Sequence, residues 1–452
     1  MLDAKFQMHP NGQGLFYSGI VDSMWDSMRF VYDIGSESKR ALTSYVESYF
    51  LPSLNGRLKL LVLSHLHNDH VNGLPALKSV LIDNVVLPYL FPYERLILAS
   101  RYVSTTRRKI ADWYLRFLAS PEKFLLDEMT VQNVSFIGGG TGWRERMSAD
   151  EGWPSTGDIG ERGEESIQPL EFPEHFGEDN LNEGNLLSVN LKPLSEATKE
   201  HLLQLESEWL KSLVSNGKVM LSSYDGYIAW NMKMLKGKWL FAFFNHFVPQ
   251  RQGLDAFRLC VQRKFRTASP MQIMQQLVNN PPSISKLRDC YKSLSNSLKN
   301  FNNSSLIMYH GPIMYHGDCR VAVKCGPWCG CPCDCRWYGC HHDCRYSRML
   351  YASHLLTGDV DLNFRYGNIK RYFGNKLQDL YFVQIPHHGA ARNWNVNILQ
   401  DAPNARIWGV SAGIRNKYRH PNTTVGTDIR VAGRCPYWVN EGRPLLLYGY
   451  CP

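Results

Sequence analysis

The stretch LVLSHLHNDHVNGL, residues 61 to 74, decides the fold because an apolar run leads directly into a cluster of metal-binding side chains. The cluster consists of His65, His67, Asp69 and His70. Imidazole and carboxylate groups suit zinc and similar divalent ions, and a turn at the end of a rigid strand directs them at a small volume. His65 and His67 share a direction, while Asp69 and His70 lie past the bend. The stretch therefore predicts two neighbouring metal ions.

Length and composition are those of an ordinary globular protein. The chain has 452 residues, enough for two or three domains or for one large domain with insertions, and 44% of them are hydrophobic. Its net charge of +9 exerts a modest attraction on polyanions, although such a balance is more often simply a solubility feature. No stretch has the roughly eighteen apolar residues that cross a bilayer, and residues 1–14 lack the apolar core of a signal peptide. We therefore expect a cytoplasmic protein without membrane association.

The first hundred residues alternate between strand and turn patterns. Residues 14–21 and 28–35 predict a β-hairpin, and residues 41–54 have a helical spacing that breaks at Pro52. Residues 58–64 are a short, continuous apolar run. Such a run is expected for a buried strand that is flanked by helices.

The middle of the chain, from about residue 85 to 300, is mainly helical in pattern. Helices are expected at 195–217, with Ser195 and Gly217 as its caps, at 252–265 and at 283–299. The Gly-rich, acidic stretch 138–188 predicts an exposed loop. Strand patterns return in 218–248, where Asp225-Gly226 and Lys236-Gly237 are the expected turns.

The last third alternates again. Residues 304–310 and 348–359 predict a hairpin whose loop is enlarged by a Cys-rich segment. Further strands are expected at 380–389, 405–413 and 444–450, with helices near 365–378 and 394–400. The architecture implied is α/β, with two β-sheets and helices outside. The expected units are 1–95 as the first half of the fold, 96–300 as a helical and strand insertion, and 301–452 as the second half, with a Cys-rich insert at 316–346.

Further ligands are expected where later strands end. Asp359 closes LLTGD, His387 and His388 follow the strand in VQIPHHG, and His420 comes soon after the strand in VSAGIRNKYRHP. The carboxyl ends of strands are where α/β folds keep their sites. A carboxylate such as Asp359 can bridge two ions, and a water between the ions loses a proton near neutral pH. This chemistry is that of a hydrolase.

The SHLHNDHVNG block resembles the HxHxDH signature of the metallo-β-lactamase superfamily, and within it the chain is similar to the ComEC-like group, named for a domain of a DNA-uptake channel protein. The blocks that carry this resemblance are NGQG at 11–14, NNSSL at 302–306, LLTGD at 355–359, IPHHG at 385–389 and VSAGIRNKYRHP at 410–421. They match in order and rough spacing and span about half the chain. The resemblance implies an αββα sandwich, here with a large helical middle insertion and a Cys-rich insert.

The resemblance also implies roles for the ligands at two zinc or manganese ions. One ion takes His65, His67 and one histidine of the 387/388 pair. The other takes Asp69, His70 and His420, and both share Asp359. Asp69 also holds the attacking water, and Asp33 orients a ligand without touching a metal.

Some positions leave alternatives open. The group follows its HHG with a serine where this chain has Ala390, and Arg419 stands where the group has glycine. We prefer His388 over His387 because it adjoins a glycine that frees the backbone, although successive strand residues face opposite ways. His246 in FFNHFV is expected to be an ordinary surface residue, or else a replacement ligand.

The Cys-rich segment is a second candidate metal site. Its members are Cys319, Cys325, Cys329, Cys331, Cys333, Cys335, Cys340 and Cys344, with His341 and His342 among them. Thiolates at such spacings fit one or two structural zinc ions, while disulfides or free thiols are the alternative. Because the segment lies between two strands that lead to the active edge, we expect a lid or a partner surface.

We expect a metal-dependent nuclease or phosphodiesterase, because two adjacent ions suit phosphodiester hydrolysis and the resemblance points to nucleic acid. The cations expected to contact phosphates, unless they are ordinary solvated charges, are Arg392, Arg415, Lys417 and Arg419. One alternative is a hydrolase of a small ester, a lactone or a nucleotide. Another is a partner-gated effector of a multi-protein system, such as an anti-phage defence cassette, which binds protein partners through its insertions.

Overall fold

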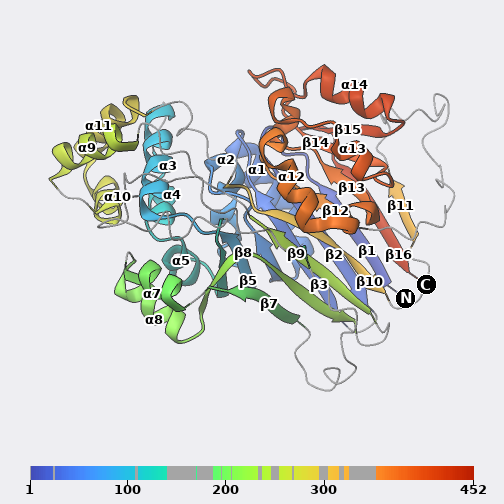
Figure 1. Ribbon diagram of the computed structural model, residues 1–452, viewed down its shortest axis with the longest axis horizontal. Helices are drawn as coiled ribbons and strands as arrows, with labels where there is room; N and C mark the ends of the chain where they lie inside the picture. Colours follow the sequence, from blue (N-terminus) through green and yellow to red (C-terminus); the bar gives the residue numbers. More distant parts are fainter. Residues whose placement is uncertain are drawn as a thin grey trace.

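A computed structural model describes residues 2–23, 26–106, 110–139, 169–170, 187–194, 196–204, 206–232, 237–245, 254–266, 269–294, 304–314, 320–324 and 353–451. The protein is α/β, with one large mixed sheet (Figure 1). In order across the sheet, the strands are β11 (Arg320–Lys324), β16 (Leu445–Cys451), β1 (Leu2–Met8), β2 (Phe16–Ser23), β3 (Ser27–Ile34), β4 (Arg57–Val62), β5 (Leu81–Pro88), β6 (Val131–Ile137), β8 (Val219–Met232), β9 (Gly237–Phe244), β10 (Ile307–Met314), β12 (Ser353–Leu356), β13 (Leu380–Gln384), β14 (Ile407–Ser411) and β15 (Cys435–Val439). Strand β7 (Leu187–Pro193) pairs with β8 off this path.

Two parallel groups in this sheet position the candidate site. Strands β3, β4, β5, β6 and β8 run parallel to one another, and so do β12, β13, β14 and β15. The HxHxDH stretch directly follows β4, Asp359 follows β12, and the 387/388 pair follows β13. These predicted ligands therefore lie at the carboxyl ends of parallel strands, as α/β sheets favour, whereas His420 lies nine residues beyond β14.

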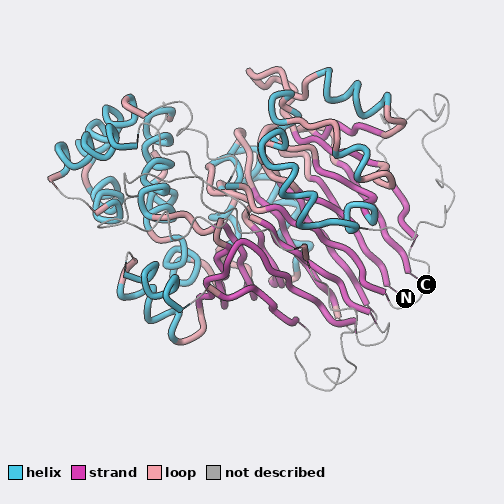
Figure 2. The backbone as a smooth tube through the Cα atoms, in the orientation of Figure 1, coloured by secondary structure: helices cyan, strands magenta, loops and turns pink. Residues whose placement is uncertain are grey.

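The sheet folds over on itself, so that its two halves share an inner core. Phe6 of β1 lies 5.6 Å from Trp239 of β9 between ring centroids, although the two strands are far apart in the sheet order. Phe30 of β3 contacts Phe241 of β9 at 4.8 Å. The sequence predicts two separate sheets, whereas the structure has one continuous sheet (Figure 2). The reason is that β6, β8 and β9, from the supposed insertion, join the two halves edge to edge.

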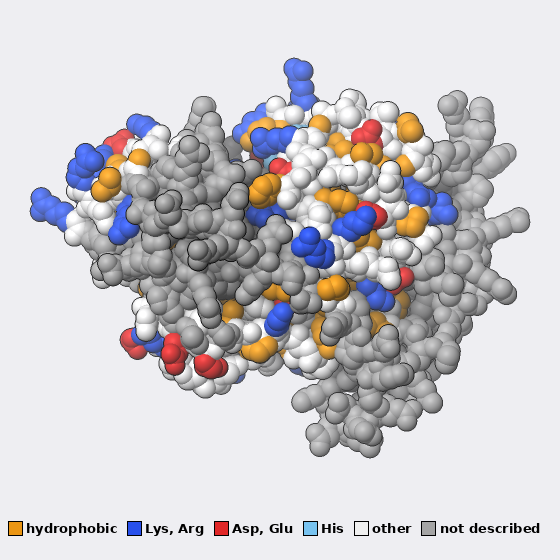
Figure 3. Space-filling model, viewed as in Figure 1, with side chains coloured by type: hydrophobic (Ala, Val, Ile, Leu, Met, Phe, Trp, Pro, Cys, Tyr) orange, Lys and Arg blue, Asp and Glu red, His pale blue; other side chains and the backbone are white. Residues whose placement is uncertain are grey.

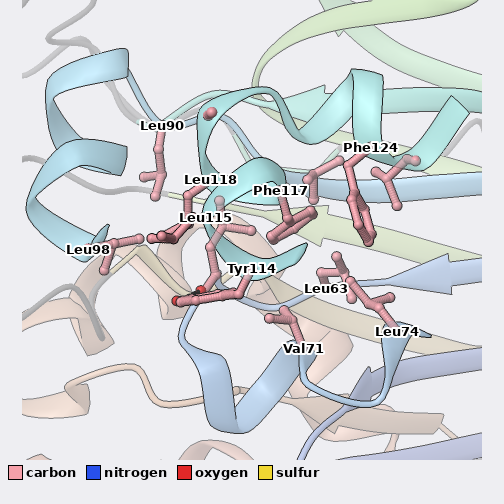
Figure 4. Close-up of a cluster of buried hydrophobic side chains, with 14 of the residues drawn as sticks. Leu63, Val71, Leu74, Leu90, Leu98, Tyr114, Leu115, Phe117, Leu118 and Phe124 are labelled. Atoms are coloured by element: carbon pink, nitrogen blue, oxygen red, sulfur yellow. Dashed lines mark hydrogen bonds between the residues drawn. The ribbon is translucent and has the colours of Figure 1, made fainter. Parts of the chain in front are cut away.

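Helices pack against the outer faces. One group covers the side of β3, β4 and β5, where Tyr114, Leu115 and Phe117 pack close to Val71 and Leu74 (Figure 4). The group comprises α1 (Lys39–Tyr45), α2 (Asn68–Val71), α3 (Pro92–Thr105), α4 (Asp112–Ala119), α5 (Pro121–Lys123), α7 (Glu196–Gln204) and α8 (Glu208–Ser215). An outer layer of α9 (Leu254–Phe265), α10 (Pro270–Asn279) and α11 (Pro281–Lys292) packs on α3 and α4 instead of on the sheet (Figure 1). The other side carries α12 (Leu362–Phe373), α13 (Ile398–Asp401) and α14 (Thr423–Val431), packed against β9, β10 and β12 to β14.

Shorter helical turns complete the described chain. They are η1 (Val46–Phe50), η2 (Leu51–Leu54), η3 (Leu74–Leu77), η4 (Phe124–Glu128), η8 (Gly374–Asp379), η9 (His387–Gly389) and η10 (Ala391–Asn393). The predicted break at Pro52 is wrong, because α1 continues through η1 into η2, where the proline occupies the first turn and has no helical N–H to lose. The segment ends instead at Asn55, which is left-handed with φ 50°.

Two predicted boundaries in the middle section are also wrong. The stretch 195–217 holds two helices, because Ser207 accepts a hydrogen bond from the Leu210 N–H at 3.2 Å and so begins α8 anew. Asp225-Gly226 lies inside β8 and is no turn, since β8 continues there alongside β7 and β9. Helix α10 was not predicted. Ser195, Lys236 and His246 lie outside the described residues.

The cysteines divide into two sets. All eight of the Cys-rich segment, with His341 and His342, lie outside the described residues. A disulfide that the sequence did not predict joins Cys260 of α9 to Cys290 of α11, with Cα atoms 5.4 Å apart. Disulfides are typical of oxidising compartments, so this pair does not favour the expected cytoplasmic location. Among the described helices, none combines the length and apolar character that a bilayer span requires.

Candidate metal centre

The HxHxDH turn is held by glycines of two other segments. A side chain on Gly35, at the end of β3, would collide with the carbonyl of Asp69 and the Cα of His70. A Cβ on Gly14, the last residue of NGQG, would lie 2.6 Å from the Asp69 carbonyl oxygen. Asn11 of the same block donates to the Gly35 carbonyl at 2.6 Å. The backbone of the ligand turn is therefore packed directly against two backbones that carry no side chain.

Asp359 is placed by a turn that is tied to the neighbouring strand. The Thr357 N–H donates to the Gln384 side-chain oxygen at 2.8 Å, and the Gln384 amide donates to the Gly358 carbonyl at 3.1 Å. The Asp359 N–H donates to the hydroxyl of Ser305 at 3.0 Å. With the turn held on both sides, the Asp359 carboxylate is fixed in place, and its side chain is only 6% exposed.

Four histidines surround this carboxylate. The Nε2 atoms of His65, His387 and His388 each lie 3.9 Å from Asp359 Oδ2. The Nε2 atom of His70 lies 3.4 Å from Asp359 Oδ1. Most of these separations are too long for hydrogen bonds, yet two ligands of one tetrahedral zinc ion lie about 3.4 Å apart at ordinary bond lengths. The spacing of the ring therefore fits shared metal ions better than direct contacts.

The other ring nitrogen of each histidine has a partner of its own. His70 Nδ1 pairs with Asp33 Oδ2 at 2.7 Å, and His65 Nδ1 lies 2.9 Å from the Ser64 hydroxyl. In the second set, His388 Nδ1 pairs with the Ser411 carbonyl at 2.8 Å and His387 Nδ1 with the Asn393 side-chain oxygen at 2.9 Å. Partners of this kind orient metal-binding histidines and fix which nitrogen is free to coordinate. All four rings are thus turned so that Nε2 faces Asp359.

Asp33, which was expected to orient a ligand, contacts the His70 ring and the end of β4. It is fully buried and accepts from the Ser64 backbone N–H at 2.6 Å as well as pairing with His70. Its φ of 56° is left-handed, which turns the carboxylate back toward the end of β4. Asp33 also lies within ligand distance of His65 and His70. Because His70 and Ser64 already use its oxygens, we assign it to orientation.

The charges of the cluster are arranged around Asp359. Burial alone would raise the pKa of the Asp359 carboxyl, but His70, His388 and His387 outweigh it and hold the pKa well below its usual range. Burial would likewise lower the pKa of His70, but Asp359 and Asp33 raise that pKa well above the ordinary value. Burial lowers the pKa of His65 well below 6.5. In this pocket one carboxylate is shared among several imidazoles, so a cation is electrostatically favoured at its centre.

Asp69 joins His70 and His388. One atom of each of these three side chains lies within 4.8 Å of the other two, a spacing that can hold an ion. The assignment implied by the family resemblance puts His420 in this group. The structure instead brings His388 there, while the His420 ring is 6.1 Å from that of His387 at the rim. Burial, followed by His388 and His387, lowers the pKa of His420 to about 4.

The 387/388 pair departs from strand geometry. Strand β13 ends at Gln384, and both His387 and His388 have positive φ, 47° and 57°. Alternation of side chains therefore does not apply to them, and both rings face Asp359. The sequence left open which of the two histidines is the ligand, and both are near Asp359. At the ion position beside Asp69, however, only His388 of the pair takes part.

His67 is the predicted ligand whose surroundings differ most. It is buried, and its Nε2 accepts a hydrogen bond from Arg101 of α3 at 2.9 Å. Its ring lies 4.7 Å from that of His65 between centroids. Burial, followed by the Arg101 charge, lowers the pKa of His67 well below 6.5. His67 is thus next to the cluster but bound to a guanidinium.

The four cations predicted to contact substrate are all solvent-exposed: Arg392, Arg415, Lys417 and Arg419. Arg392 lies close enough to His420 to contribute to the lowering of that group's pKa, and Lys417 lies 4.8 Å from the Tyr418 ring. Lysine and arginine side chains are spread over the face that carries α12 (Figure 3). Acidic side chains lie among them on the same face (Figure 3).

The residues present fit a metal ion by one direct test. Within the described residues, the buried Nε2 atoms of His65 and His70 have no hydrogen-bond partner. A buried polar nitrogen without a partner costs about 1–3 kcal/mol, so two of them beside one carboxylate call for a ligand. Imidazole nitrogens and carboxylate oxygens are the donor set that zinc and manganese accept.

Comparison with known proteins gives no independent support for a family: no protein-family model matches the chain, and no curated protein is significantly similar to it. The site therefore stands on its own geometry. Sequence reasoning missed Ser64, Ser305, Asn393 and Arg101 as parts of it. Ser305 lies in the NNSSL block, which was a signal for it, whereas Asn393 and Arg101 lie in stretches with no recognisable pattern.

Proposed function

We propose that the protein is a dinuclear metal-dependent hydrolase of the metallo-β-lactamase type, and that its substrate is a phosphodiester, most simply a nucleic acid. The observation that carries the proposal is the ring of four Nε2 atoms at 3.4–3.9 Å from the Asp359 carboxylate. Helices outside two facing halves of a sheet are also what an αββα sandwich would have. Divalent ions supply Lewis acidity toward water and a phosphoryl oxygen when bound.

The protein's own groups would divide the remaining work. His65, His70, His387 and His388 would hold the ions with Asp359, and Asp33 would keep the His70 ring in place. Asp69 is only partly buried and lies beside His70 and His388, so its carboxylate can orient a water and accept a proton from it. Arg101 next to His67 and Arg392 near His420 place positive charge at the border of the ring. Such a border favours an anionic substrate over a neutral ester.

The test is purified protein with zinc or manganese, offered single-stranded DNA, double-stranded DNA, RNA, a generic chromogenic phosphodiester, a lactone and a carboxylic ester. We expect cleavage by the wild-type protein and none by Asp359→Asn, with metal content measured on both. Cleavage of the small diester alone would replace the nuclease with a small-molecule phosphodiesterase. Two bound ions without any cleavage would favour the partner-gated effector, and cleavage of a lactone or carboxylic ester alone would overturn the phosphodiester assignment.

A further inference from the structure

Arg101 was not predicted from the sequence, and the proposed function uses it only as a positive charge beside the site. It lies on α3, and its guanidinium donates to His67 Nε2 at 2.9 Å. The helix is fixed on both sides: Arg288 of α11 donates to the Val103 carbonyl at 2.6 Å, and Tyr102 packs on Tyr114 at 4.6 Å. The contact with His67 is therefore set by a packed helix, half-buried at the edge of the site.

This hydrogen bond identifies the state of the His67 ring. Arginine has donors only, so the Nε2 atom that accepts from it carries a lone pair and no proton. The same nitrogen lone pair is what a metal ion requires of a histidine ligand. Since Nε2 has a single lone pair in the ring plane, the guanidinium and a metal ion exclude one another there. A metal that takes His67 must displace Arg101.

A displaced guanidinium would remain beside other positive charge. Lys417 is near enough that the Arg101 charge acts to lower its pKa, although Tyr418, followed by the Glu37 carboxylate, raises that pKa overall. Two neighbouring cations at the rim of a metal cluster are relieved together by one anion. A planar guanidinium is also suited to bind two oxygens of a phosphate at once.

We propose that Arg101 competes with the metal ion for His67 and, once displaced, binds the anionic group of the substrate. The inference rests on the proposed function for the identity of the anion, but the competition itself does not. Its consequence is thermodynamic linkage: an anion that holds the guanidinium away from His67 strengthens metal binding, and the metal strengthens anion binding by the same factor.

The experiment measures zinc affinity by competition with a chromophoric chelator, with and without inorganic phosphate, for wild type, Arg101→Gln and Arg392→Gln. Arg392→Gln removes the same charge near His420 and leaves the His67 contact intact, so it is the matched control. Without phosphate, we expect Arg101→Gln to bind its weaker zinc ion about 10-fold more tightly than wild type, as the loss of one competing hydrogen bond of about 1.4 kcal/mol predicts. Arg392→Gln should gain much less.

Phosphate provides the second measurement. It should tighten zinc binding by wild type several-fold more than by Arg101→Gln, whose remaining response is the direct binding of phosphate to zinc. Arg101→Lys, which keeps the charge but loses the planar fork, should lie between the two and guards against a misfolded glutamine variant. Equal gains in zinc affinity for Arg101→Gln and Arg392→Gln would overturn the proposal. So would an equal tightening of zinc binding by phosphate in wild type and in Arg101→Gln. Absence of zinc binding in every protein would overturn the proposed hydrolase as well, which distinguishes the two failures.

Discussion

The molecule contains two buried groups of histidines, and they differ in what their second nitrogen meets. In the metal centre, His65 and His70 have partners at Nδ1 and turn Nε2 toward Asp359. In the inner core, His310 and His354 share the hydroxyl of Tyr17, at 3.0 Å and 2.6 Å. No carboxylate of the described residues pairs with these two rings, which lie among Phe6, Phe30, Phe241 and Phe382.

The comparison shows that burial alone does not make a metal site. Burial lowers the pKa of His354 to about 3 and that of His310 well below 6.5, so both rings are neutral at physiological pH. The Tyr17 hydroxyl can donate to one ring and accept from the other without any charge, while His310 Nδ1 and His354 Nε2 have no hydrogen-bond partner among the described residues. A carboxylate among imidazoles, by contrast, leaves a buried negative charge that a cation can neutralise.

The strongest test of the difference removes the carboxylate. We expect Asp359→Asn to lower hydrolysis by about 10⁴-fold and to reduce bound metal, because the shared ligand and its charge are lost together. Metal content by elemental analysis and single-turnover rates are the measurements. His354→Gln changes a buried histidine outside the site and should retain the metal. An unchanged metal content in Asp359→Asn would remove the distinction between the two groups.

A smaller loss is expected from the residue that orients His70. Asp33→Asn keeps the shape of the side chain but removes the charge behind the imidazole, so metal affinity should fall by about 10- to 100-fold. A chelator titration measures it, and circular dichroism monitors folding. If affinity is retained while stability falls, Asp33 serves the packing of β3 and β4 rather than the site.

The core group should respond to pH in one direction only. His354 has a pKa near 3 in the folded protein and about 6.5 when unfolded, so acid protonates the unfolded chain first. Its contribution is fully present above 6.5 and is lost as pH falls, by about 2 kcal/mol between pH 7.5 and pH 5. Urea unfolding of wild type and His354→Phe across this range measures the difference. Parallel pH profiles for the two proteins would contradict it.

The smallest effect is expected from the hydroxyl that joins the core histidines. Tyr17→Phe leaves two buried ring nitrogens without their shared partner and should lower the free energy of unfolding by about 1–3 kcal/mol. Metal content should stay at the wild-type level, because Tyr17 belongs to the inner core. Loss of metal in this variant would mean that the two groups are coupled through the sheet.

Much of the site could be predicted because its ligands follow strand ends in short, distinctive blocks. His65, His70, Asp359 and the 387/388 pair are brought together as expected. Which histidine faces Asp359 could not be predicted, since the answer depends on two successive left-handed residues that no local pattern announces. Arg101 could not be found either, because its contact with His67 depends on how α3 packs 34 residues away.

The fold divides in a similar way. The hairpin of β2 and β3 and the pairing of β10 with β12 follow from local alternation and were expected. That the middle section would contribute β6, β8 and β9 to the same sheet was not, because strand partners are chosen by tertiary contact. The sequence treats this section as an insertion that contains helices and strands, and the structure adds that its strands belong to the continuous sheet.

The two glycines against the ligand turn carry a consequence for genetics. Gly14 and Gly35 have no functional group, yet any side chain there meets the backbone of Asp69. In a library of all single substitutions scored by activity, these positions should be as intolerant as the ligands themselves. Such a scan would therefore mark more positions than the metal-binding residues alone. Two of its most sensitive positions would be glycines, the smallest residues in the chain.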